Sequence, residues 1–167
     1  TSEYNSDGGV TAILRYTLRL LTTQQRDRIT KMVLAAELIR QKTYPKYGTE
    51  PISIGFWVGG GVTPNKFEEL VEKADKPGEA KRKRNQLYKQ LLTCPFCGKP
   101  LTEEEFYIDP EQKSVAIYCA DNTCLFYKYK QKRIQIPVYL VDEEIYAKCP
   151  TIILSTVDKF ARLPWDV

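Results

Sequence analysis

Four cysteines in the middle of the chain have a spacing that is typical of metal ligands. They form two pairs, Cys94 with Cys97 and Cys119 with Cys124, and 21 residues separate the pairs. Two cysteine pairs about 20 residues apart suit a tetrahedral zinc ion held by four thiolates. Gly98 follows the first pair and permits the tight turn that directs two sulfur atoms toward one point. The spacing therefore predicts a structural Zn²⁺ site, because four protein ligands leave no open position for a substrate.

Other uses of these cysteines fit the pattern less well. A thioredoxin-like redox pair needs no second pair, and secreted disulfide scaffolds are smaller and richer in cysteine. Free or redox-active thiols are the alternative to zinc. The fifth cysteine, Cys149, stands apart, before Pro150 and an apolar stretch. We expect it to be a buried free thiol.

The composition excludes several classes of protein. The 167 residues include no histidine, so histidine acid–base catalysis and histidine metal ligation are both excluded. Hydrophobic residues make up 43% of the chain, which is enough for an ordinary core, and the net charge of +4 is mild. No apolar run is long enough to cross a bilayer, and the polar N-terminus lacks the core of a signal peptide. We therefore expect a cytoplasmic protein without membrane contact. The missing initiator Met and the abrupt C-terminus indicate a segment of a longer protein.

The apolar pattern predicts alternating strands and helices on both sides of the cysteines. Strands are predicted at 10–16, 52–58, 137–141 and 151–154, and helices at 23–42, 63–74, 85–92, 142–147 and from 157 onward. This alternation predicts an α/β fold with a parallel sheet covered on both faces. Segments 106–108 and 115–118 are predicted to pair as antiparallel strands between the cysteine pairs, which is the plan of a zinc ribbon. The predicted domain ranges are 1–78 (α/β segment), 79–133 (basic helix and four-cysteine insertion) and 134–167 (return to the α/β segment).

Helix ends and faces follow from the same pattern. Candidate N-caps are Thr22 or Thr23, Thr63 before Pro64, and Thr156. The predicted apolar face of helix 23–42 consists of Ile29, Val33 and Ala36, with Met32 and Ile39 alongside.

Three of the predicted strands are followed by residues that offer a hydroxyl, a free backbone N–H group or a cation, within 16–24, 58–63 and 154–159. They include Thr17, Arg19, Gly59, Gly60, Ser155, Thr156 and Lys159. The C-terminal ends of parallel strands lie at one edge of the sheet, where α/β proteins bind ligands. A helix N-terminus follows each strand and favours an anion. Together these segments predict contact with a nucleic-acid backbone; ordinary caps and turns are the alternative for each one taken singly.

Basic residues flank the cysteine module on both sides. The first group is Lys81, Arg82, Lys83 and Arg84, and the second includes Lys128, Lys130 and Lys132. In a strand at 126–133 these three lysines face one way and Tyr127 and Tyr129 the other. Lysines neutralise phosphates and aromatic rings stack on bases, so the pattern favours nucleic acid. A solvated charged face is the alternative.

The chain lacks an ATP-binding loop. No G-x-x-x-x-G-K-[ST] motif is present. Asp142, Glu143 and Glu144 follow an apolar strand, as the acids of a Walker B motif do. Without a phosphate loop we interpret them as a surface turn with solvated carboxylates.

Several segments together resemble the first RecA-like domain of superfamily 2 helicases. They are VTAILRYTLRLLTTQQRDR, FWVGGGVTPN and VDEEIYAKCPTIILSTVDKFARLPW, with the four-cysteine module between them. The nearest branch is the DrmA-type helicase of DISARM phage-defence systems. The resemblance covers nearly the whole chain and implies a partial parallel RecA-like sheet with an inserted zinc-ribbon-like module. It also implies a prokaryotic enzyme that translocates on or unwinds nucleic acid, DNA in preference to RNA, alongside other defence-system subunits.

The resemblance also implies roles for particular residues. Motif Ia would fall on Thr17 and Arg19, motif Ib on Gly59 and Gly60, and motif Ic on Ser155 and Thr156. Val157 and Asp158 stand where motif Ic usually has Pro and Gly. The acidic box of the family follows motif Ic, whereas Asp142 precedes it. Motifs I and II would therefore lie outside this chain, ATP and Mg²⁺ would bind only the parent protein, and the chain alone would not hydrolyse ATP.

Two other functions compete with this interpretation. The first is a standalone zinc-ribbon protein that binds nucleic acid or acts as a scaffold without enzymatic activity. The second is a small-molecule or nucleotide α/β enzyme that uses Asp142 or Glu143 as its acid or base.

Overall fold

The computed structural model describes residues 9–17, 21–59, 61–128 and 134–160. Its centre is a four-stranded sheet in the order β1 (Ala12–Tyr16), β6 (Ile152–Thr156), β2 (Ile54–Trp57) and β5 (Val138–Tyr139). All three neighbouring pairs are parallel. The predicted α/β fold with a parallel sheet is therefore confirmed.

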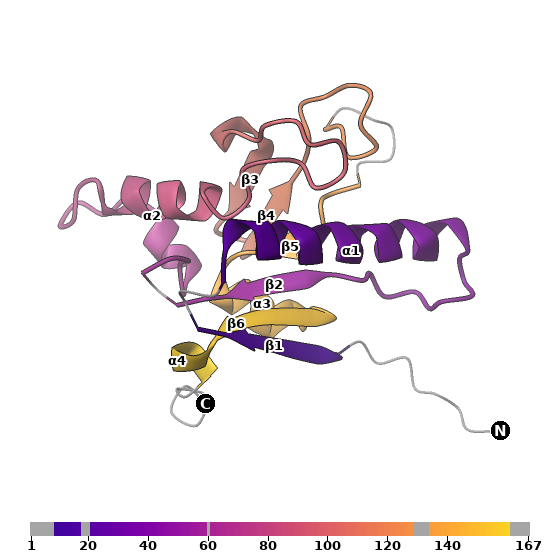
Figure 1. Ribbon diagram of the computed structural model, residues 1–167. Helices are drawn as coiled ribbons and strands as arrows, with labels where there is room; N and C mark the ends of the chain where they lie inside the picture. Colours follow the sequence, from indigo (N-terminus) through magenta and orange to yellow (C-terminus); the bar gives the residue numbers. More distant parts are fainter. Residues whose placement is uncertain (1–8, 18–20, 60, 129–133, 161–167) are drawn as a thin grey trace.

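Helix α1 (Thr23–Lys42) lies along one face of the sheet (Figure 1). Alternate residues of the strands point to this face, and Phe56 and Leu154 join Val33 and Leu34 of α1 in the main core. The opposite face carries a smaller cluster formed by Trp57, Tyr139 and Ile145 of α3 (Asp142–Lys148). The two sets of side chains thus place helices on both faces, as a parallel sheet requires.

Close packing of α3 against β2 depends on one glycine. A Cβ atom at Gly55 would lie 2.9 Å from Pro150 Cγ and 3.0 Å from Ile145 Cγ1. A larger residue would push α3 away from the sheet, so Gly55 is required here by space rather than by backbone conformation.

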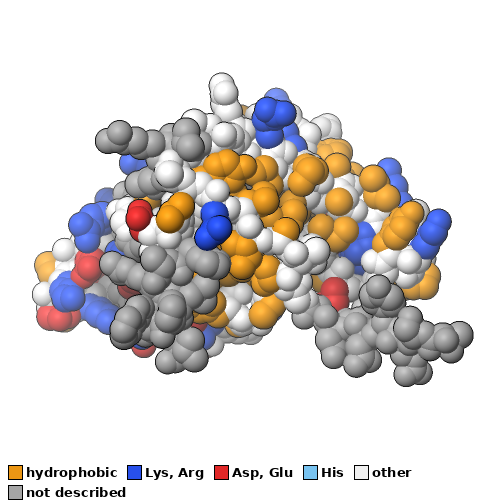
Figure 2. Space-filling model, turned by 60° about the horizontal axis from the view of Figure 1, so that its bottom comes forward, with side chains coloured by type: hydrophobic (Ala, Val, Ile, Leu, Met, Phe, Trp, Pro, Cys, Tyr) orange, Lys and Arg blue, Asp and Glu red, His pale blue; other side chains and the backbone are white. Residues whose placement is uncertain are grey.

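The face that α3 covers is open over β1. Ile13 points away from the main core and is 42% exposed, and Arg15 beside it is also exposed. Figure 2 shows apolar side chains gathered over this side of the molecule.

The start of α1 was predicted correctly, and its apolar face only in part. Thr22 is the N-cap and forms a capping box with Gln25. Val33 is buried, but Met32 and Ile39 are exposed, contrary to the prediction. Two polar residues, Glu37 and Arg40, are buried on the inner face of α1 instead of Met32 and Ile39.

Glu37 and Arg40 bind each other and the chain that enters β2. Arg40 Nε and Nη2 donate to the two Glu37 carboxylate oxygens, each at 2.7 Å. Glu37 Oε2 also accepts the Ile52 N–H at 2.7 Å. Arg40 Nη1 donates to the carbonyl oxygens of Gly48 and Thr49 at 3.1 Å. These bonds satisfy a buried ion pair and fix the loop between α1 and β2.

Two predicted helices differ from the structure. The segment 63–74 contains only a 3₁₀ helix, η1 (Phe67–Leu70), and Thr63 does not cap it. Glu69 Oε1 accepts the N–H groups of Asn65 and Lys66, and the backbone becomes extended at Val71. Val71 is 42% exposed, so the apolar pattern continues past Leu70 without a helix to bury it.

The second difference is α2 (Glu79–Tyr88), which was predicted at 85–92. It begins directly after Gly78, whose φ of +80° suits glycine. The basic residues 81–84 therefore lie within this helix.

The remaining elements agree with the predictions in kind. The predicted antiparallel hairpin is β3 (Phe106–Asp109) with β4 (Ser114–Ile117), preceded by η2 (Glu103–Glu105). Strand β6 runs to Thr156, so this residue ends the strand before α4 (Val157–Phe160).

Cys149 is exposed, contrary to the prediction of a buried thiol, because it ends α3 in the left-handed conformation with φ of 45°.

The cysteine module shares the main core with the sheet. The same cluster of buried residues contains Leu34 and Phe56 as well as Cys94, Ile117 and Phe126. The division into the ranges 1–78, 79–133 and 134–167 stays a prediction.

Candidate metal centre and nucleic-acid interface

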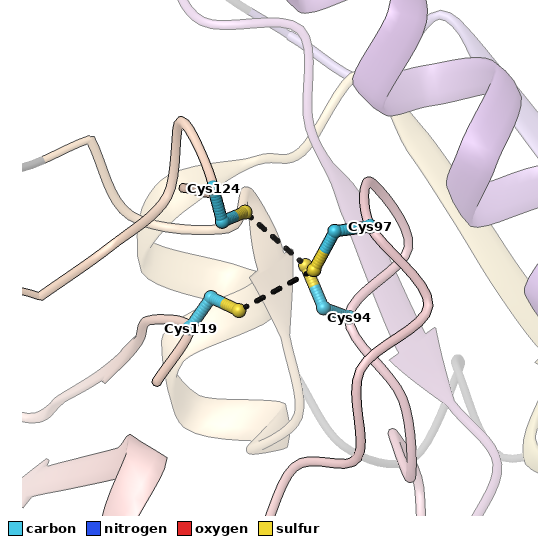
Figure 3. Close-up of side chains that lie close together, drawn as sticks. All are labelled: Cys94, Cys97, Cys119 and Cys124. Carbon is cyan, nitrogen blue, oxygen red and sulfur yellow. Dashed lines mark hydrogen bonds between the residues drawn. The ribbon is translucent and has the colours of Figure 1, made fainter. Parts of the chain in front are cut away.

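The four predicted metal ligands meet at one point (Figure 3). The Sγ atoms of Cys94 and Cys124 lie 3.8 Å apart, and those of Cys97 and Cys119 lie 3.6 Å apart. All four sulfur atoms lie within 4.8 Å of one another. A tetrahedral zinc ion with Zn–S bonds of about 2.3 Å needs sulfur atoms about 3.8 Å apart. The arrangement therefore fits a zinc ion at its centre, and none of the four cysteines forms a disulfide.

The first cysteine pair lies on a tight turn. The Cys94 N–H donates to Lys99 O, and the Gly98 N–H donates to Cys94 O, both at 2.8 Å. Gly98 has a φ of +76°, a conformation that favours glycine. The predicted role of this glycine is confirmed.

The second pair is held by a wider turn. Asp121 Oδ1 accepts both the N–H and the hydroxyl of Thr123, and Asp121 O accepts the Cys124 N–H at 3.0 Å. The Asp121 N–H donates to Cys119 Sγ, and the Phe126 N–H donates to Cys124 Sγ, each at 3.4 Å. Such donors stabilise negative charge on sulfur, which suits a thiolate ligand.

Burial makes two of the thiols difficult to ionise without a cation. Burial raises the pKa of Cys119 to about 12 and also raises the pKa of Cys124. Burial opposes ionisation of Cys97 as well, but hydrogen bonds from Lys99 and the neighbouring thiols outweigh it, so the pKa of Cys97 is lowered. A divalent cation at the centre would supply the charge that lets all four ligands ionise.

The strands of the sheet place three predicted contact segments at one edge. Tyr16 of β1 pairs with Thr156 of β6, and Trp57 of β2 pairs with Ser155. Because the strands are parallel, β1, β6 and β2 all end at this edge, on the same side as α4 in Figure 1. We call this the strand-end edge.

The predicted contact residues at the strand-end edge differ in accessibility. Thr17 is exposed. Gly59 has a φ of +96°, and its carbonyl oxygen accepts the N–H groups of Val62 at 2.8 Å and Thr63 at 2.9 Å. Ser155 and Thr156 are buried. Arg19 and Gly60 lie outside the described residues.

The basic residues 81–84 point in different directions from α2. Lys81 and Arg82 are exposed. Lys83 is buried and pairs with Glu69 at 2.6 Å, and Arg84 Nε donates to Leu70 O at 2.8 Å. Half of the run therefore attaches α2 to η1, and phosphate binding by Lys83 would require breaking its ion pair.

The second basic group is described only at its start. Lys128 is partly buried, and its N–H donates to Cys119 O at 3.2 Å. Lys130 and Lys132, with Tyr129, lie outside the described residues. The predicted alternation of lysines and tyrosines in 126–133 therefore stays a prediction.

The acids after β5 are not the solvated surface turn that the sequence suggested. Asp142 and Glu144 are each 2% exposed. Burial raises the pKa of Asp142 to about 6, although its ion pair with Lys159 opposes the rise. Burial also raises the pKa of Glu144 to about 7. The signal that pointed to this burial was the continuous apolar run 137–141, which places the following residues against the core.

Lys159 also has a different role from the one expected. It was expected to be a cation available at a helix N-terminus, but its side chain is 10% exposed. Its Nζ donates to Asn65 Oδ1 at 2.9 Å and pairs with Asp142 Oδ2. The charge is therefore neutralised inside the protein.

A comparison with curated proteins finds one similar region. The chain is 48% identical over 172 residues to the DISARM protein DrmA of Bacillus paralicheniformis. The alignment covers 99% of this chain and 15% of that protein, so the chain spans about a seventh of the relative's length. The chain is thus a homologue of one part of DrmA. No protein-family model matches the chain.

No helix in the described part of the chain is long and apolar enough to cross a membrane.

Proposed function

We propose that the chain is the nucleic-acid-binding part of an ATP-dependent superfamily 2 helicase or translocase that acts in phage defence. The parent protein would act on DNA in the cytoplasm with other subunits of a DISARM-type system. This chain would supply part of the DNA-gripping surface of a RecA-like lobe, and the motifs that bind ATP and Mg²⁺ would lie elsewhere in the polypeptide. The similarity to the DISARM protein DrmA supports the link to phage defence.

The observation that carries the proposal is the parallel alignment of β1, β6 and β2. Their common register brings Thr17 and Gly59 to the strand-end edge, on either side of Thr156. Ligands of open α/β sheets gather at this edge. Contacts there would go to phosphate groups and would be largely independent of base sequence. Arg19 is proposed as the cation among them.

The cysteine module would be a structural zinc site. Four thiolates close the coordination sphere, so the metal would stabilise the fold and would not activate water. The buried Phe126 and the shared core explain why the module would lose its packing without metal. Cys94, Cys97, Cys119 and Cys124 are the proposed ligands.

DNA binding by the zinc-loaded chain tests the proposal. Fluorescence anisotropy with a labelled oligothymidylate of about 20 nucleotides measures the Kd, because a typical binding fold contacts fewer nucleotides than that. Arg19→Ala is expected to raise the Kd about tenfold, as loss of a charge-assisted phosphate contact does. The control Lys42→Ala removes an exposed cation at the far end of α1 and should leave the Kd unchanged. No measurable DNA binding by the wild-type chain would contradict the proposal.

The standalone zinc-ribbon protein predicts the opposite result. In that case affinity would reside in the basic flanks of the module, and charge reversal at Lys81 and Arg82 would abolish binding. Arg19→Ala would then bind as tightly as wild type. The exposure of Lys81 and Arg82 on α2 is the observation that favours this second function.

A further inference from the structure

Three strand ends converge on a single buried ammonium group. Lys159, in α4 directly after β6, donates from Nζ to Asn65 Oδ1 at 2.9 Å and pairs with Asp142 Oδ2. Asn65 belongs to the segment after β2, and Asp142 is the first residue after β5 and Leu140–Val141. One side chain thus connects the segments that follow β6, β2 and β5.

The backbone reinforces the same junction. The Asp142 N–H donates to Pro64 O at 3.2 Å, and the Glu143 N–H donates to Asn65 O at 3.0 Å. The Phe67 N–H donates to Glu143 Oε2 at 3.1 Å. The segment that follows Gly59 is therefore hydrogen-bonded to the start of α3, and Lys159 of α4 binds both the segment and α3.

The surroundings make the ammonium difficult to replace. Lys159 Nζ lies 5.9 Å from the centre of the Trp57 ring, which adds a cation–π contact. Asp142 is 2% exposed, and Asp142 Oδ1 accepts no hydrogen bond from the residues that the structure describes. Without Lys159, the Asp142 carboxylate would be left buried with no compensating charge.

We propose that Lys159 is a positioning residue, which through Asp142 and Asn65 fixes the segment 61–66 against β6 and so sets the spacing of the nucleic-acid contacts at the strand-end edge. The inference rests on the proposed nucleic-acid function. Lys159 itself would touch no phosphate, because its charge is already satisfied inside the protein. Its effect on binding would pass through the position of Gly59 relative to Thr156.

The test combines hydrogen exchange with DNA binding for Lys159→Met, Asp142→Asn and the double variant. Lys159→Met is expected to speed amide exchange in 61–66 at least tenfold and to raise the Kd for the labelled oligothymidylate about tenfold. The double variant should bind DNA no more weakly than the single variants, because each single variant already removes the one interaction that the two residues share. Lys159→Arg keeps the charge and should change amide exchange and the Kd less than Lys159→Met does. If Lys159→Met does not fold, Asn65→Ala replaces it and should change both quantities in the same direction by a smaller amount. Lys42→Met, at an exposed position far from this edge, is the matched control.

The outcomes separate this inference from the proposed function. If wild type binds DNA and the variants bind equally well, Lys159 is not a positioning residue, while the proposed function stands. If wild type does not bind DNA, the proposed function fails, and exchange in 61–66 alone decides whether Lys159 fixes the segment. Unchanged exchange in Lys159→Met would overturn the inference in either case.

Discussion

The N–H of Val115 donates to Glu144 Oε1 at 3.2 Å, which joins the hairpin of the cysteine module to α3 of the sheet. Both residues are buried, and they lie 29 positions apart in the chain. The module therefore does not project freely from the sheet. Lys113 and Glu143 form a second connection beside it, at 2.5 Å.

Glu144→Gln is predicted to change how stability depends on pH. Burial raises the folded-state pKa of Glu144 from 4.5 to about 7, so the folded protein binds this proton more tightly than the unfolded chain. The contribution of the protonated Glu144 carboxyl group to the free energy of unfolding is full at low pH and is lost as pH rises through about 7. At about pH 8 the variant should therefore be more stable than wild type by on the order of 2 kcal/mol.

Urea unfolding between about pH 4 and pH 8 measures this difference. Gln keeps the acceptor oxygen for Val115 and removes the titration. Glu50→Gln, at an exposed carboxylate, is the control and should follow the wild-type curve. If the free energy of unfolding changes with pH by the same amount in wild type and Glu144→Gln, Glu144 does not titrate in this range.

Zinc removal is predicted to destabilise the whole chain, because the module shares the main core. Cys94→Ser should lose bound zinc and lower the free energy of unfolding by about 3 kcal/mol or more, which corresponds to roughly 10 °C in Tm. Elemental analysis and thermal unfolding with and without a chelator measure both quantities. Cys149→Ser is the control, since Cys149 is exposed and outside the cluster. A zinc content of Cys94→Ser equal to that of wild type would rule out the four-thiolate site.

Neighbouring lysines in α2 are predicted to differ in role. Lys83→Met should cost about 1–2 kcal/mol of stability, because it leaves Glu69 without its ion-pair partner. Lys81→Met should change stability by less than about 0.5 kcal/mol, since Lys81 is exposed. Chemical denaturation of the two variants measures the contrast. A greater loss for Lys81→Met than for Lys83→Met would contradict the assignment.

Glu37→Ala is predicted to be severely destabilising, by about 3–4 kcal/mol. It would remove the partner of Arg40 and the acceptor of the Ile52 N–H, both in a buried setting. Lys31→Ala on the exposed side of α1 is the control and should cost little. Differential scanning calorimetry of both variants gives the comparison, and a loss below about 1 kcal/mol for Glu37→Ala would show that the pair is easily replaced.

The chain alone is predicted to have no ATPase activity, because its sequence has no phosphate-binding loop. Phosphate release with Mg²⁺, ATP and DNA should equal that of the buffer control. Turnover that persists through purification would contradict the placement of the ATP motifs outside this chain.

Much of the fold followed from the sequence because local pattern determined it. The bounds of α1 matched the prediction, and Thr22 caps its start as expected. The strands of the sheet were visible as continuous apolar runs. The clustering of the four cysteines was predicted correctly because turn geometry brings residues of such spacing together, and Gly98 has the positive φ that the first turn needs.

Only the tertiary structure decided which charged residues are buried. Lys83, Asp142 and Lys159 look like solvated side chains in the sequence, and each is buried against a partner far along the chain. The free energy of burying a charge depends on that partner. The alignment of β5 and β6 brings Asp142 and Lys159 together, and the packing of α2 against η1 brings Lys83 to Glu69. The sequence by itself determined the strands, the main helix and the grouping of the four cysteines, whereas tertiary packing determined which charged side chains stay exposed.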